Sequence, residues 1–431
     1  MLRSLVLALA MGGCVVAATG VGTTTASGPP GPPPPPRYEA VAPRAGYVFI
    51  TGAWMWQGGQ WVWIAGHWER ERAAPPLEIG DGGPAPASTG SPGSTPSSPG
   101  AIVALALGEN HTCSLSAAGQ IRCWGYNKQG SLGIGSQQDP GDGLVAGIDG
   151  SVRAIAAGGY QTCALTTMGA VWCWGANHAG QVGNGAVSDT PVPRPTRVGG
   201  VDNVRSLHLG DATSCAATMD GKLYCWGDNS QHQIDGSSNK TITRPTRVAG
   251  VDRADLVAVG NYHLCVATAG RVQCRGELAP LNAQLSPLNH VTALSAGWGH
   301  SCALQDGKPS CWGKSYLGIL GAGDVCRRNG ECATALRAPA AVPGVDGATQ
   351  LVGLDYHSCV LGAGGAVTCW GNNQGHAFSD ELPAEPYQTA HPLAGVTAEV
   401  VLVGGVHTCT LRAGIATCRG NDWAGAVRGA R

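Results

Sequence analysis

The sequence CALTTMGAVWCWG, residues Cys163–Gly175, decides the fold, because versions of it recur seven times along the chain. Each copy carries two cysteines nine or ten residues apart, with a glycine-containing turn between two short apolar runs. Such a pattern predicts a β-hairpin. The seven cysteine pairs are Cys113 with Cys123, Cys163 with Cys173, Cys215 with Cys225, Cys265 with Cys274, Cys302 with Cys311, Cys359 with Cys369, and Cys409 with Cys418.

The cysteine spacing fits disulfides across the hairpins. In an antiparallel hairpin, residues i and j face each other when their numbers add up to the same sum along the whole hairpin. The Cα atoms of a facing pair that is not hydrogen-bonded lie about 4.5 Å apart, a distance that a disulfide can span. Where the cysteines are ten apart, the fold leaves a three-residue loop that ends in Gly119, Gly169, Gly221 or Gly365. Where they are nine apart, it leaves a two-residue loop, Ala269-Gly270, Asp306-Gly307 or Ala413-Gly414. When the distance between the two cysteines shrinks by one residue, the loop glycine also moves by one position. A disulfide across a hairpin explains this coupling, whereas metal binding by the cysteines does not.

Composition narrows the class of protein. The chain has 431 residues, with 67 glycines and only 2 phenylalanines, so many tight turns are expected. Its 27 basic and 28 acidic residues give no electrostatic reason to bind nucleic acid. Of the 17 cysteines, 14 lie in the hairpins, Cys326 and Cys332 form a predicted eighth pair within a loop, and Cys14 remains alone. Eight disulfides indicate an oxidising compartment.

The N-terminus indicates export. Residues 1–13 are predicted to be a signal peptide, with Arg3 before an apolar run. The run ends in Met11-Gly12-Gly13-Cys14, which resembles the lipobox of bacterial lipoproteins. The resemblance implies acylation of Cys14 and anchoring to the bacterial outer membrane, on the periplasmic or the cell-surface side. The alternative is an ordinary signal peptide cleaved near Ala17-Ala18. No other segment has the 18 or more apolar residues that a membrane-spanning helix needs.

Two tethers flank a second repeat region. Residues 14–37 hold the lipid anchor site and a proline-rich tether, and residues 73–100 form a Gly/Pro/Ser linker. Between them, residues 38–72 contain three aromatic-x-x-Gly-x-Trp hexads and resemble the tryptophan–glycine repeats of small bacterial envelope lipoproteins. We expect short strands in a small β-meander. Its tryptophans either pack on one another as a mini-core or bind glycan, peptidoglycan or protein: Trp54, Trp56, Trp61, Trp63 and Trp68.

The region from residue 101 to 431 is predicted to be an all-β, seven-bladed propeller, because its units recur at about 50 residues and are rich in strand and turn signals. Each unit has an inner run before the hairpin and an outer run after it, as in 152–158 and 195–198. The fourth unit is short, and the fifth is enlarged by a loop at 324–335. The seventh stops without an outer run, so we expect a segment near Ser88–Ala101 to complete it.

The repeats resemble a known family. The phrase is clearest in Ala157–Leu165 (AGGYQTCAL), Val171–Asn177 (VWCWGAN) and Gly180–Gly185 (GQVGNG), and it resembles the repeat of the regulator-of-chromosome-condensation family of seven-bladed propellers. The cysteines and leader are similar to a secreted bacterial branch with the architecture of β-lactamase inhibitor protein II. Arg275 and Arg419 depart from the pattern, because they replace the tryptophan of Trp-Gly, and the fourth and sixth units lack the Gly-x-Leu-Gly loop.

Five histidines stand two residues before a first cysteine, namely His111, His263, His300, His357 and His407. Each belongs to a different blade, so they should form a ring too wide for one metal ion. We expect them to be half-buried and to bond neighbouring backbone groups. No nucleophile elbow, phosphate loop, zinc helix or close carboxylate pair is found, so neither an enzyme nor a cofactor is predicted.

The sequence therefore predicts an envelope-anchored scaffold that binds a protein or glycan partner in the cell envelope. The favoured surface is the face that carries the Asp324–Ala335 loop. An inhibitor of a secreted or periplasmic enzyme is the alternative. A guanyl-nucleotide exchange factor is implied by the family resemblance, but the oxidising compartment argues against it.

Overall fold

The computed structural model describes residues 102–323, 337–412, 415–422 and 425–427, together with four short strands between residues 47 and 70. It divides into two units, Met1–Pro75 and Pro76–Arg431. The leader, the tether and the linker lie outside the described residues, as do Cys14, Cys326 and Cys332. Within the described ranges, no helix is both long and apolar enough to cross a membrane.

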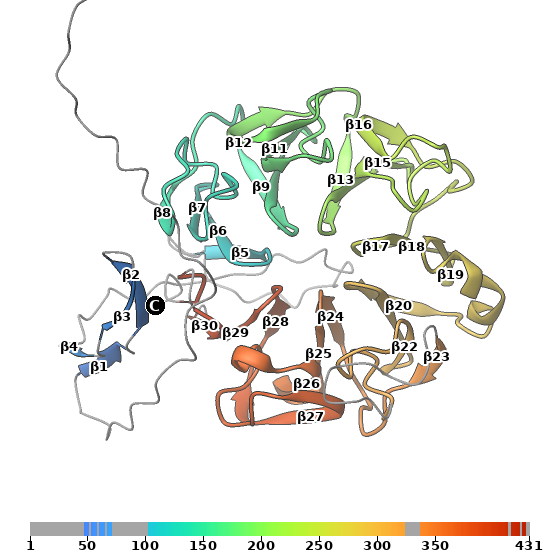
Figure 1. Ribbon diagram of the computed structural model, residues 1–431. Coiled ribbons are helices and arrows are strands. Elements are labelled where there is room, and N and C mark those ends of the chain that lie inside the picture. Colours follow the sequence, from blue (N-terminus) through green and yellow to red (C-terminus); the bar gives the residue numbers. More distant parts are fainter. Residues whose placement is uncertain are drawn as a thin grey trace, which may run out of the picture. The chain divides into compact units, whose positions relative to one another are not determined.

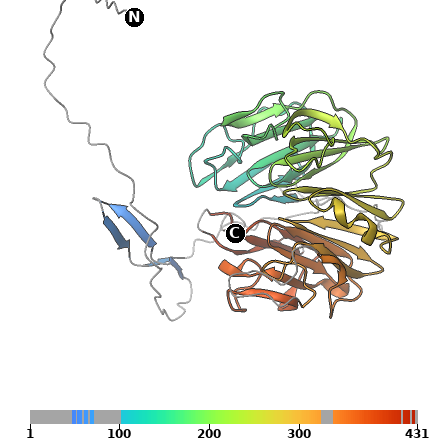
Figure 2. The same ribbon diagram turned by 45° about the vertical axis from the view of Figure 1, so that its right-hand side comes forward.

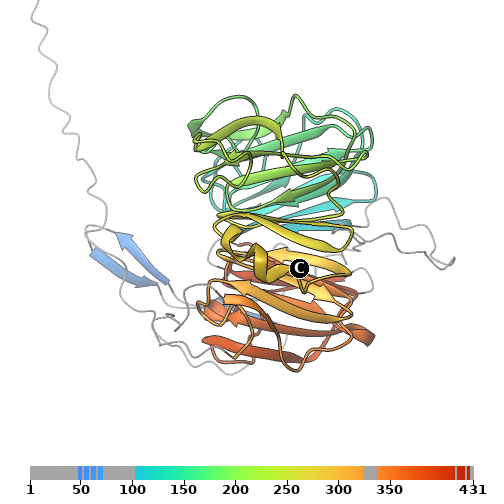
Figure 3. The same cartoon turned by 90° about the vertical axis from the view of Figure 1, so that its right-hand side faces the viewer.

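Seven antiparallel sheets surround one axis in the larger unit, which confirms the predicted propeller (Figure 1). The turned views show the same ring of blades obliquely and from the side (Figure 2 and Figure 3). The first three blades have four strands each. They are β5 (Ile102–Leu107), β6 (His111–Ser116), β7 (Ile121–Gly125) and β8 (Gly141–Leu144); β9 (Val152–Ala157), β10 (Gln161–Thr166), β11 (Val171–Asn177) and β12 (Ser188–Arg197); β13 (Val204–Leu209), β14 (Thr213–Thr218), β15 (Leu223–Asp228) and β16 (Thr241–Arg247).

The other four blades vary in their outer part. Blade 4 has β17 (Leu256–Val259), β18 (His263–Thr268) and β19 (Arg271–Gly276), followed by the 3-10 helix η1 (Ala279–Leu285). Blade 5 has β20 (Val291–Ala296), β21 (His300–Gln305), β22 (Lys308–Gly313) and β23 (Arg337–Ala341). Blade 6 has β24 (Gln350–Leu354), β25 (His357–Leu361), β26 (Ala366–Asn372) and β27 (Pro386–Thr397), with short 3-10 turns η2 (Ala363–Gly365) and η3 (Gln374–His376). Blade 7 has β28 (Val400–Val403), β29 (His407–Arg412) and β30 (Ile415–Gly420).

Seven disulfides staple the middle strands of the seven blades. In each blade the two cysteines are register partners, as the spacing predicts, and their Cα atoms lie 4.0–4.1 Å apart. The bonds join Cys113 to Cys123, Cys163 to Cys173, Cys215 to Cys225, Cys265 to Cys274, Cys302 to Cys311, Cys359 to Cys369, and Cys409 to Cys418.

The hairpin loops have the conformations that their lengths require. Gly169 ends its three-residue loop with φ +76°, and Ala269-Gly270 turns with φ of +49° and +74°. Both residues of the two-residue loop are thus left-handed, as a type I′ turn requires. Loop length and disulfide register therefore agree in both kinds of hairpin.

The core lies between neighbouring blades. All six residues of β10 and of β14 are buried, whereas the outer β12 has no buried residue. Four tryptophans tie their blade to the preceding one, because each buried indole N–H donates to a carbonyl in the segment after the third strand of that preceding blade. The pairs are Trp174 to Ser131 (2.8 Å), Trp226 to Gln181 (2.9 Å), Trp370 to Ile319 (3.1 Å) and Trp124 to Ala426 (2.9 Å).

The bond from Trp124 to Ala426 closes the ring. The hydroxyl of Thr112 also donates to the Ala426 carbonyl (3.0 Å), and Gly405 N–H donates to the Gly108 carbonyl (3.1 Å). Residues 425–427 from the C-terminal end thus join blade 7 to blade 1. The segment near Ser88–Ala101, expected to complete blade 7, lies outside the described residues, and the described part of that sheet has three strands.

The smaller unit corrects the expected meander. Its strands are β1 (Tyr47–Ile50), β2 (Ala53–Gln57), β3 (Gln60–Ile64) and β4 (His67–Arg70), and the pairs are β1–β4 and β2–β3 (Figure 1). Every facing pair sums to 117, as in Tyr47↔Arg70 and Trp54↔Trp63. The four strands therefore pair in a nested order, with β2–β3 between the strands of the β1–β4 pair in sequence.

Candidate binding site at the mouth of the propeller

Seven short loops join the first and second strands of the blades, and together they form what we call the mouth: residues 108–110, 158–160, 210–212, 260–262, 297–299, 355–356 and 404–406. Because consecutive strands are antiparallel, these loops lie at one end of the axis. The connections from third to fourth strand leave the same end, and the one in blade 5 begins at Lys314.

A belt of backbone hydrogen bonds fixes the mouth loops. At five of the blade junctions, the residue four before the first cysteine donates its N–H to a carbonyl in the next blade's loop, as Glu109 does to Gly159 (3.0 Å) and Trp298 to Asp355 (2.9 Å). The glycines beneath allow this close approach. A Cβ on Gly158 would lie 2.0 Å from the carbonyl oxygen of Gly210. The mouth is thus a preformed scaffold whose side chains vary from blade to blade.

The five histidines form a second, deeper belt. Each Nε2 contacts the hydroxyl that precedes the first cysteine of the next blade, in the pairs His111–Thr162 (2.8 Å), His263–Ser301 (2.7 Å), His300–Ser358 (3.2 Å), His357–Thr408 (2.8 Å) and His407–Thr112 (3.0 Å). The expectation of half-buried rings bonded to backbone was wrong, since all five are fully buried and bond side chains. The small hydroxyl side chain of the next blade leaves room for the imidazole.

The histidines are neutral in this belt. Thr162 donates its hydroxyl proton to the Ser131 carbonyl (2.9 Å), so it accepts from the Nε2–H of His111. Burial, with a smaller contribution from the charge of His407, lowers the pKa of His111 to about 3. In the described parts of the chain, no three histidine, cysteine or acidic side chains are grouped so that they could hold a metal ion. The belt thus joins blades.

Three carboxylates face one another across the mouth: Glu109, Asp211 and Asp355. A Cβ on Gly405 would lie 2.7 Å from Asp355 Oδ2 and 2.7 Å from Glu109 Cγ, so these two side chains crowd the same glycine. Asp211 lies over Gly159, where an added Cβ would be 2.1 Å from its Oδ1. The mouth therefore gathers negative charge from blades 1, 3 and 6.

The pKa values of these acids show the effect of the crowding. Burial, then the negative charges of Glu109 and Asp211, raise the pKa of Asp355 to about 7, against a hydrogen bond from Asn261 that lowers it. Burial also raises the pKa values of Glu109 and Asp211. At Asp211 the charge of His178 opposes this rise, whereas at Glu109 and Asp355 neighbouring negative charges add to it.

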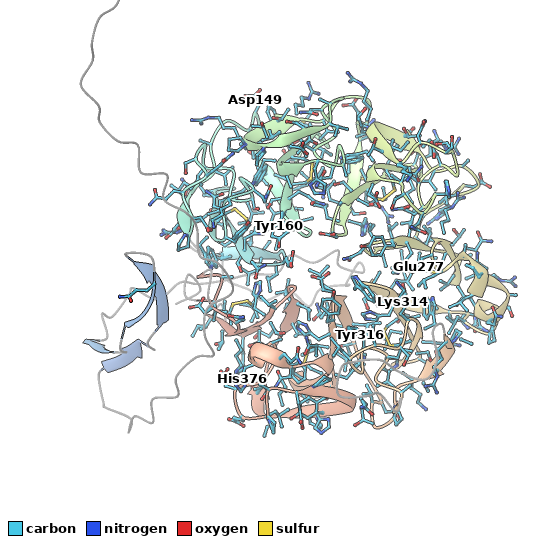
Figure 4. All side chains as sticks on the ribbon, viewed as in Figure 1. Asp149, Tyr160, Glu277, Lys314, Tyr316 and His376 are labelled. Atoms are coloured by element: carbon cyan, nitrogen blue, oxygen red, sulfur yellow. A yellow bond between two sulfur atoms is a disulfide. The ribbon has the colours of Figure 1, made fainter. Side chains whose placement is uncertain are left out.

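Aromatic rings border the carboxylates. Trp298, Tyr316 and Tyr356 form a cluster with ring centroids 5.7–6.2 Å apart, and Tyr126 and Tyr160 form a pair 5.3 Å apart. All five side chains are half-buried, so each also exposes surface. In Figure 4, Tyr160 and Tyr316 lie on the inner half of the ring, from blades on different sides of the axis.

The surface around these aromatic rings also contains a basic side chain, that of Lys314. Lys314 pairs with Glu277 (2.6 Å), and its Nζ lies 4.2 Å from the ring centroid of Trp298. Figure 4 shows Lys314 and Glu277 near one another on the inner half of the ring. The ammonium is therefore held by an acid of the neighbouring blade and by an aromatic face, and its charge is already matched by Glu277.

The residues singled out in the sequence lie elsewhere. The hairpin cysteines are joined in disulfides within the blades, and the Asp324–Ala335 loop lies outside the described residues. The tryptophans of the smaller unit are register partners, with Trp54 opposite Trp63 and Trp56 opposite Trp61, and Trp68 lies opposite Phe49 in the other strand pair.

Sequence reasoning missed the mouth acids. The sequence does contain a signal for these acids, at the position four residues before the first cysteine of each repeat. That position holds an acid, an amide, a tryptophan or a glycine, namely Glu109, Gly159, Asp211, Asn261, Trp298, Asp355 and Gly405. Equivalent positions of a propeller meet at one level of the axis. Aligning the seven units by their cysteines would therefore have shown three acids converging on one ring.

Comparison with known proteins agrees with the repeat assignment. The regulator of chromosome condensation (RCC1) repeat matches residues 102–131, 152–181 and 204–233 in one form and residues 168–217 and 220–267 in another. Two copies of the WXXGXW repeat match residues 44–69. The chain matches no curated protein.

One of the similar solved structures shares the fold. Prp20p from Saccharomyces cerevisiae, described with its binding to Gsp1p and histones, is 21% identical and superposes with a TM-score of 0.61, over 75% of this chain and 84% of that one. Human WBSCR16 is 18% identical, with a TM-score of 0.46 and 70% of each chain covered. The repeats, the seven four- or three-stranded blades and the likeness to Prp20p agree, and the chain is a seven-bladed β-propeller of the RCC1-repeat type preceded by a WXXGXW repeat.

Proposed function

We propose that this protein is an exported scaffold that binds a protein or glycan partner in the cell envelope through the mouth of its propeller. The observation that carries the proposal is the backbone belt, which holds the mouth loops rigidly while their side chains differ from blade to blade. Half-buried tyrosine and tryptophan on a rigid frame are the side chains that anchor interfaces.

Export follows from the disulfides. Disulfides form and persist in oxidising surroundings, so seven of them favour an extracellular or periplasmic location. We further propose that Cys14 is acylated and anchors the chain to the bacterial outer membrane, as its Met-Gly-Gly-Cys context suggests. The tryptophan hairpin would then lie between two tethers, as a second candidate surface for glycan or peptidoglycan.

The anchor has a direct test. Mass analysis of the N-terminal peptide from the membrane fraction should show a diacylated or triacylated Cys14, and Cys14→Ser should release the protein into the soluble fraction. An unmodified N-terminus beginning near Val15–Thr19 would instead show an ordinary signal peptide. That result would remove the anchor from the proposal and leave the propeller's role untouched.

The binding face is tested by capture from an envelope extract with the purified propeller. Trp298→Ala removes an aromatic of the mouth and should reduce capture of its partner at least tenfold. Met168→Ala is the matched control, because Met168 is 83% exposed and lies in a hairpin loop at the opposite end of the blades. Equal capture by the two variants would show that the mouth is not the binding face.

Inhibition of a secreted enzyme is the second function that the rigid mouth favours, since preorganised surfaces bind tightly. An inhibitor can be distinguished from a scaffold by the activity of the partner that it binds. If the captured partner is an enzyme, one equivalent of propeller should abolish its activity, with slow recovery on dilution. Nucleotide exchange has weaker support, because Prp20p resembles this chain at 21% identity, which shows the fold alone.

A further inference from the structure

The mouth has an excess of buried negative charge and hydrogen-bond acceptors. Asp355 is only 8% exposed, and Asn261, also 8% exposed, donates its amide to that carboxylate. The other end of the amide, Asn261 Oδ1, is buried and accepts no hydrogen bond from any residue that the structure describes. Buried amide oxygens in folded proteins nearly always have a donor, so this one is unusual.

The same pattern recurs beside Glu109. Asn110 follows it in the mouth loop, is 5% exposed, and its Oδ1 likewise has no donor among the described residues. Two orphan acceptors and three carboxylates thus belong to one ring of loops. The ammonium of Lys314 already pairs with Glu277 at 2.6 Å and lies over Trp298. No cation of the described residues contributes to the pKa shifts of Glu109 and Asp355, so a donor that carries positive charge would suit this part of the mouth.

The shape of the cluster selects the kind of cation. In the described residues no three acidic, histidine or cysteine side chains converge closely enough for a metal ion. The acids are spread over blades 1, 3 and 6, and half-buried rings lie beside them, with Tyr160 next to Glu109 and Tyr356 next to Asp355. Acceptors at several points with flat rings alongside suit a planar group with several N–H donors better than a point charge.

We propose that the mouth binds an arginine side chain of a protein partner, whose guanidinium donates to the carboxylates of Asp355 and Glu109 and stacks on the neighbouring tyrosines. This inference rests on the proposed scaffold function, and it names the chemistry that the partner must bring. Glycine is required at positions 159 and 405 for these acids to keep their places. A Cβ on Gly159 would clash with Asp211, and a Cβ on Gly405 would clash with Asp355 and Glu109.

The test uses fluorescently labelled Gly-Arg-Gly-Arg-Gly and the same peptide with citrulline, which is isosteric with arginine and uncharged. Binding to the purified propeller is measured by polarisation at 20 and 300 mM salt. We expect the arginine peptide to bind at least tenfold more tightly than the citrulline peptide, and to weaken at high salt. Equal affinities for the two peptides would overturn the inference.

Variants assign the binding to the mouth. Asp355→Asn and Glu109→Gln should each weaken the arginine peptide at least fivefold. Asp202→Asn is the matched control, because it removes the same charge from an exposed acid after the outer strand of blade 2, and should change affinity less than twofold. Thermal melting checks that all three are folded. Unchanged binding by folded Asp355→Asn would contradict the assignment.

Further outcomes distinguish failure of the proposed arginine site from failure of the proposed scaffold function. Competition by free L-arginine amide at the same concentration as the peptide would overturn the part that names a protein side chain and point to a small cation. If Asp355→Asn still captures the envelope partner that Trp298→Ala has lost, the arginine site is wrong and the scaffold function stands. If both variants lose the partner, both proposals are supported.

Discussion

At the scale of single residues, the junctions between blades depend on a few buried polar contacts. Trp174 and Trp312 are equivalent residues of blades 2 and 5, and both are fully buried. The indole of Trp174 has the Ser131 carbonyl as its acceptor, whereas that of Trp312 has no acceptor among the described residues. The reason is local: blade 4 is short, and η1 replaces the loop that would have carried the carbonyl.

This difference predicts unequal effects of one substitution. Trp174→Phe and Trp312→Phe remove the same atoms, but only the first leaves a buried carbonyl with one donor fewer. Because Thr162 still donates to that carbonyl, Trp174→Phe should lower the free energy of unfolding by about 0.5–1.5 kcal/mol more than Trp312→Phe. Denaturant melts of the two variants measure the difference. Equal losses would show that the indole bond contributes nothing to the junction.

The histidine belt predicts acid sensitivity. The pKa of His111 is about 3 in the folded protein and that of His357 is also about 3, against about 6.5 in the unfolded chain. Below pH 6.5 the unfolded chain therefore binds more protons, and the free energy of unfolding falls as the pH drops towards 3. Each histidine contributes a slope of up to about 1.4 kcal/mol per pH unit.

Asp355 acts in the opposite direction, because its raised pKa favours the folded state below pH 4 and this contribution is lost as the pH rises through 7. His111→Gln should reduce the slope between pH 4 and 6 by one histidine's share, and adding His357→Gln by two. Glutamine suits the position, since Gln161 occupies it in blade 2 and bonds the Gly210 carbonyl. Urea melts across this range test the slope, and an unchanged slope would contradict the buried neutral state.

At the scale of elements, the hairpin is the unit that the sequence predicts best. Its register follows from local facts, namely the cysteine distance and a glycine whose conformation the loop requires. The same midpoint rule describes the tryptophan hairpin, yet the sequence predicted a meander there. Three equal hexads allow each strand to pair with the next one along the chain or allow the outer strands to pair around the inner ones. No disulfide such as Cys163–Cys173 fixes the register in this segment, so the spacing alone does not decide between the two arrangements.

A turn substitution tests the hairpin geometry. Ala269 holds φ +49° in the two-residue loop of blade 4, where a residue with a Cβ is strained, and Asn tolerates this conformation better. Ala269→Asn should raise the free energy of unfolding by about 0.5–1 kcal/mol. Asp306→Asn, at the equivalent position of blade 5, should change it little because Asp already suits the turn. A destabilised Ala269→Asn would argue against a type I′ loop.

At the scale of the whole molecule, the ring and its mouth depend on contacts far apart in the sequence. The blade count followed from repeat spacing, but the closing contact of Ala426 with Trp124 spans 302 residues and involves a carbonyl, which leaves no mark in the sequence. The acidic ring escaped prediction for a similar reason. No single repeat contains it, and it exists only when Glu109, Asp211 and Asp355 meet around the axis.

Closure predicts the effect of shortening the chain. Truncation after Asp422 removes the buried Ala426 carbonyl and leaves the indole of Trp124 and the hydroxyl of Thr112 without their acceptor. We expect a loss of about 2–6 kcal/mol of unfolding free energy. Truncation after Arg428 keeps the contact and serves as the control. If both truncations melt alike, closure does not depend on residues 425–427.

The central claim is that seven covalently stapled blades make an exported, rigid binding platform. Peptide mapping of the protein from its native cells, digested without reductant and with free thiols alkylated, tests it most directly. We predict seven linked pairs, each within one hairpin, from Cys113 with Cys123 in blade 1 to Cys409 with Cys418 in blade 7. Alkylated cysteines at these positions, or links between different blades, would contradict the staples and the oxidising compartment that follows from them.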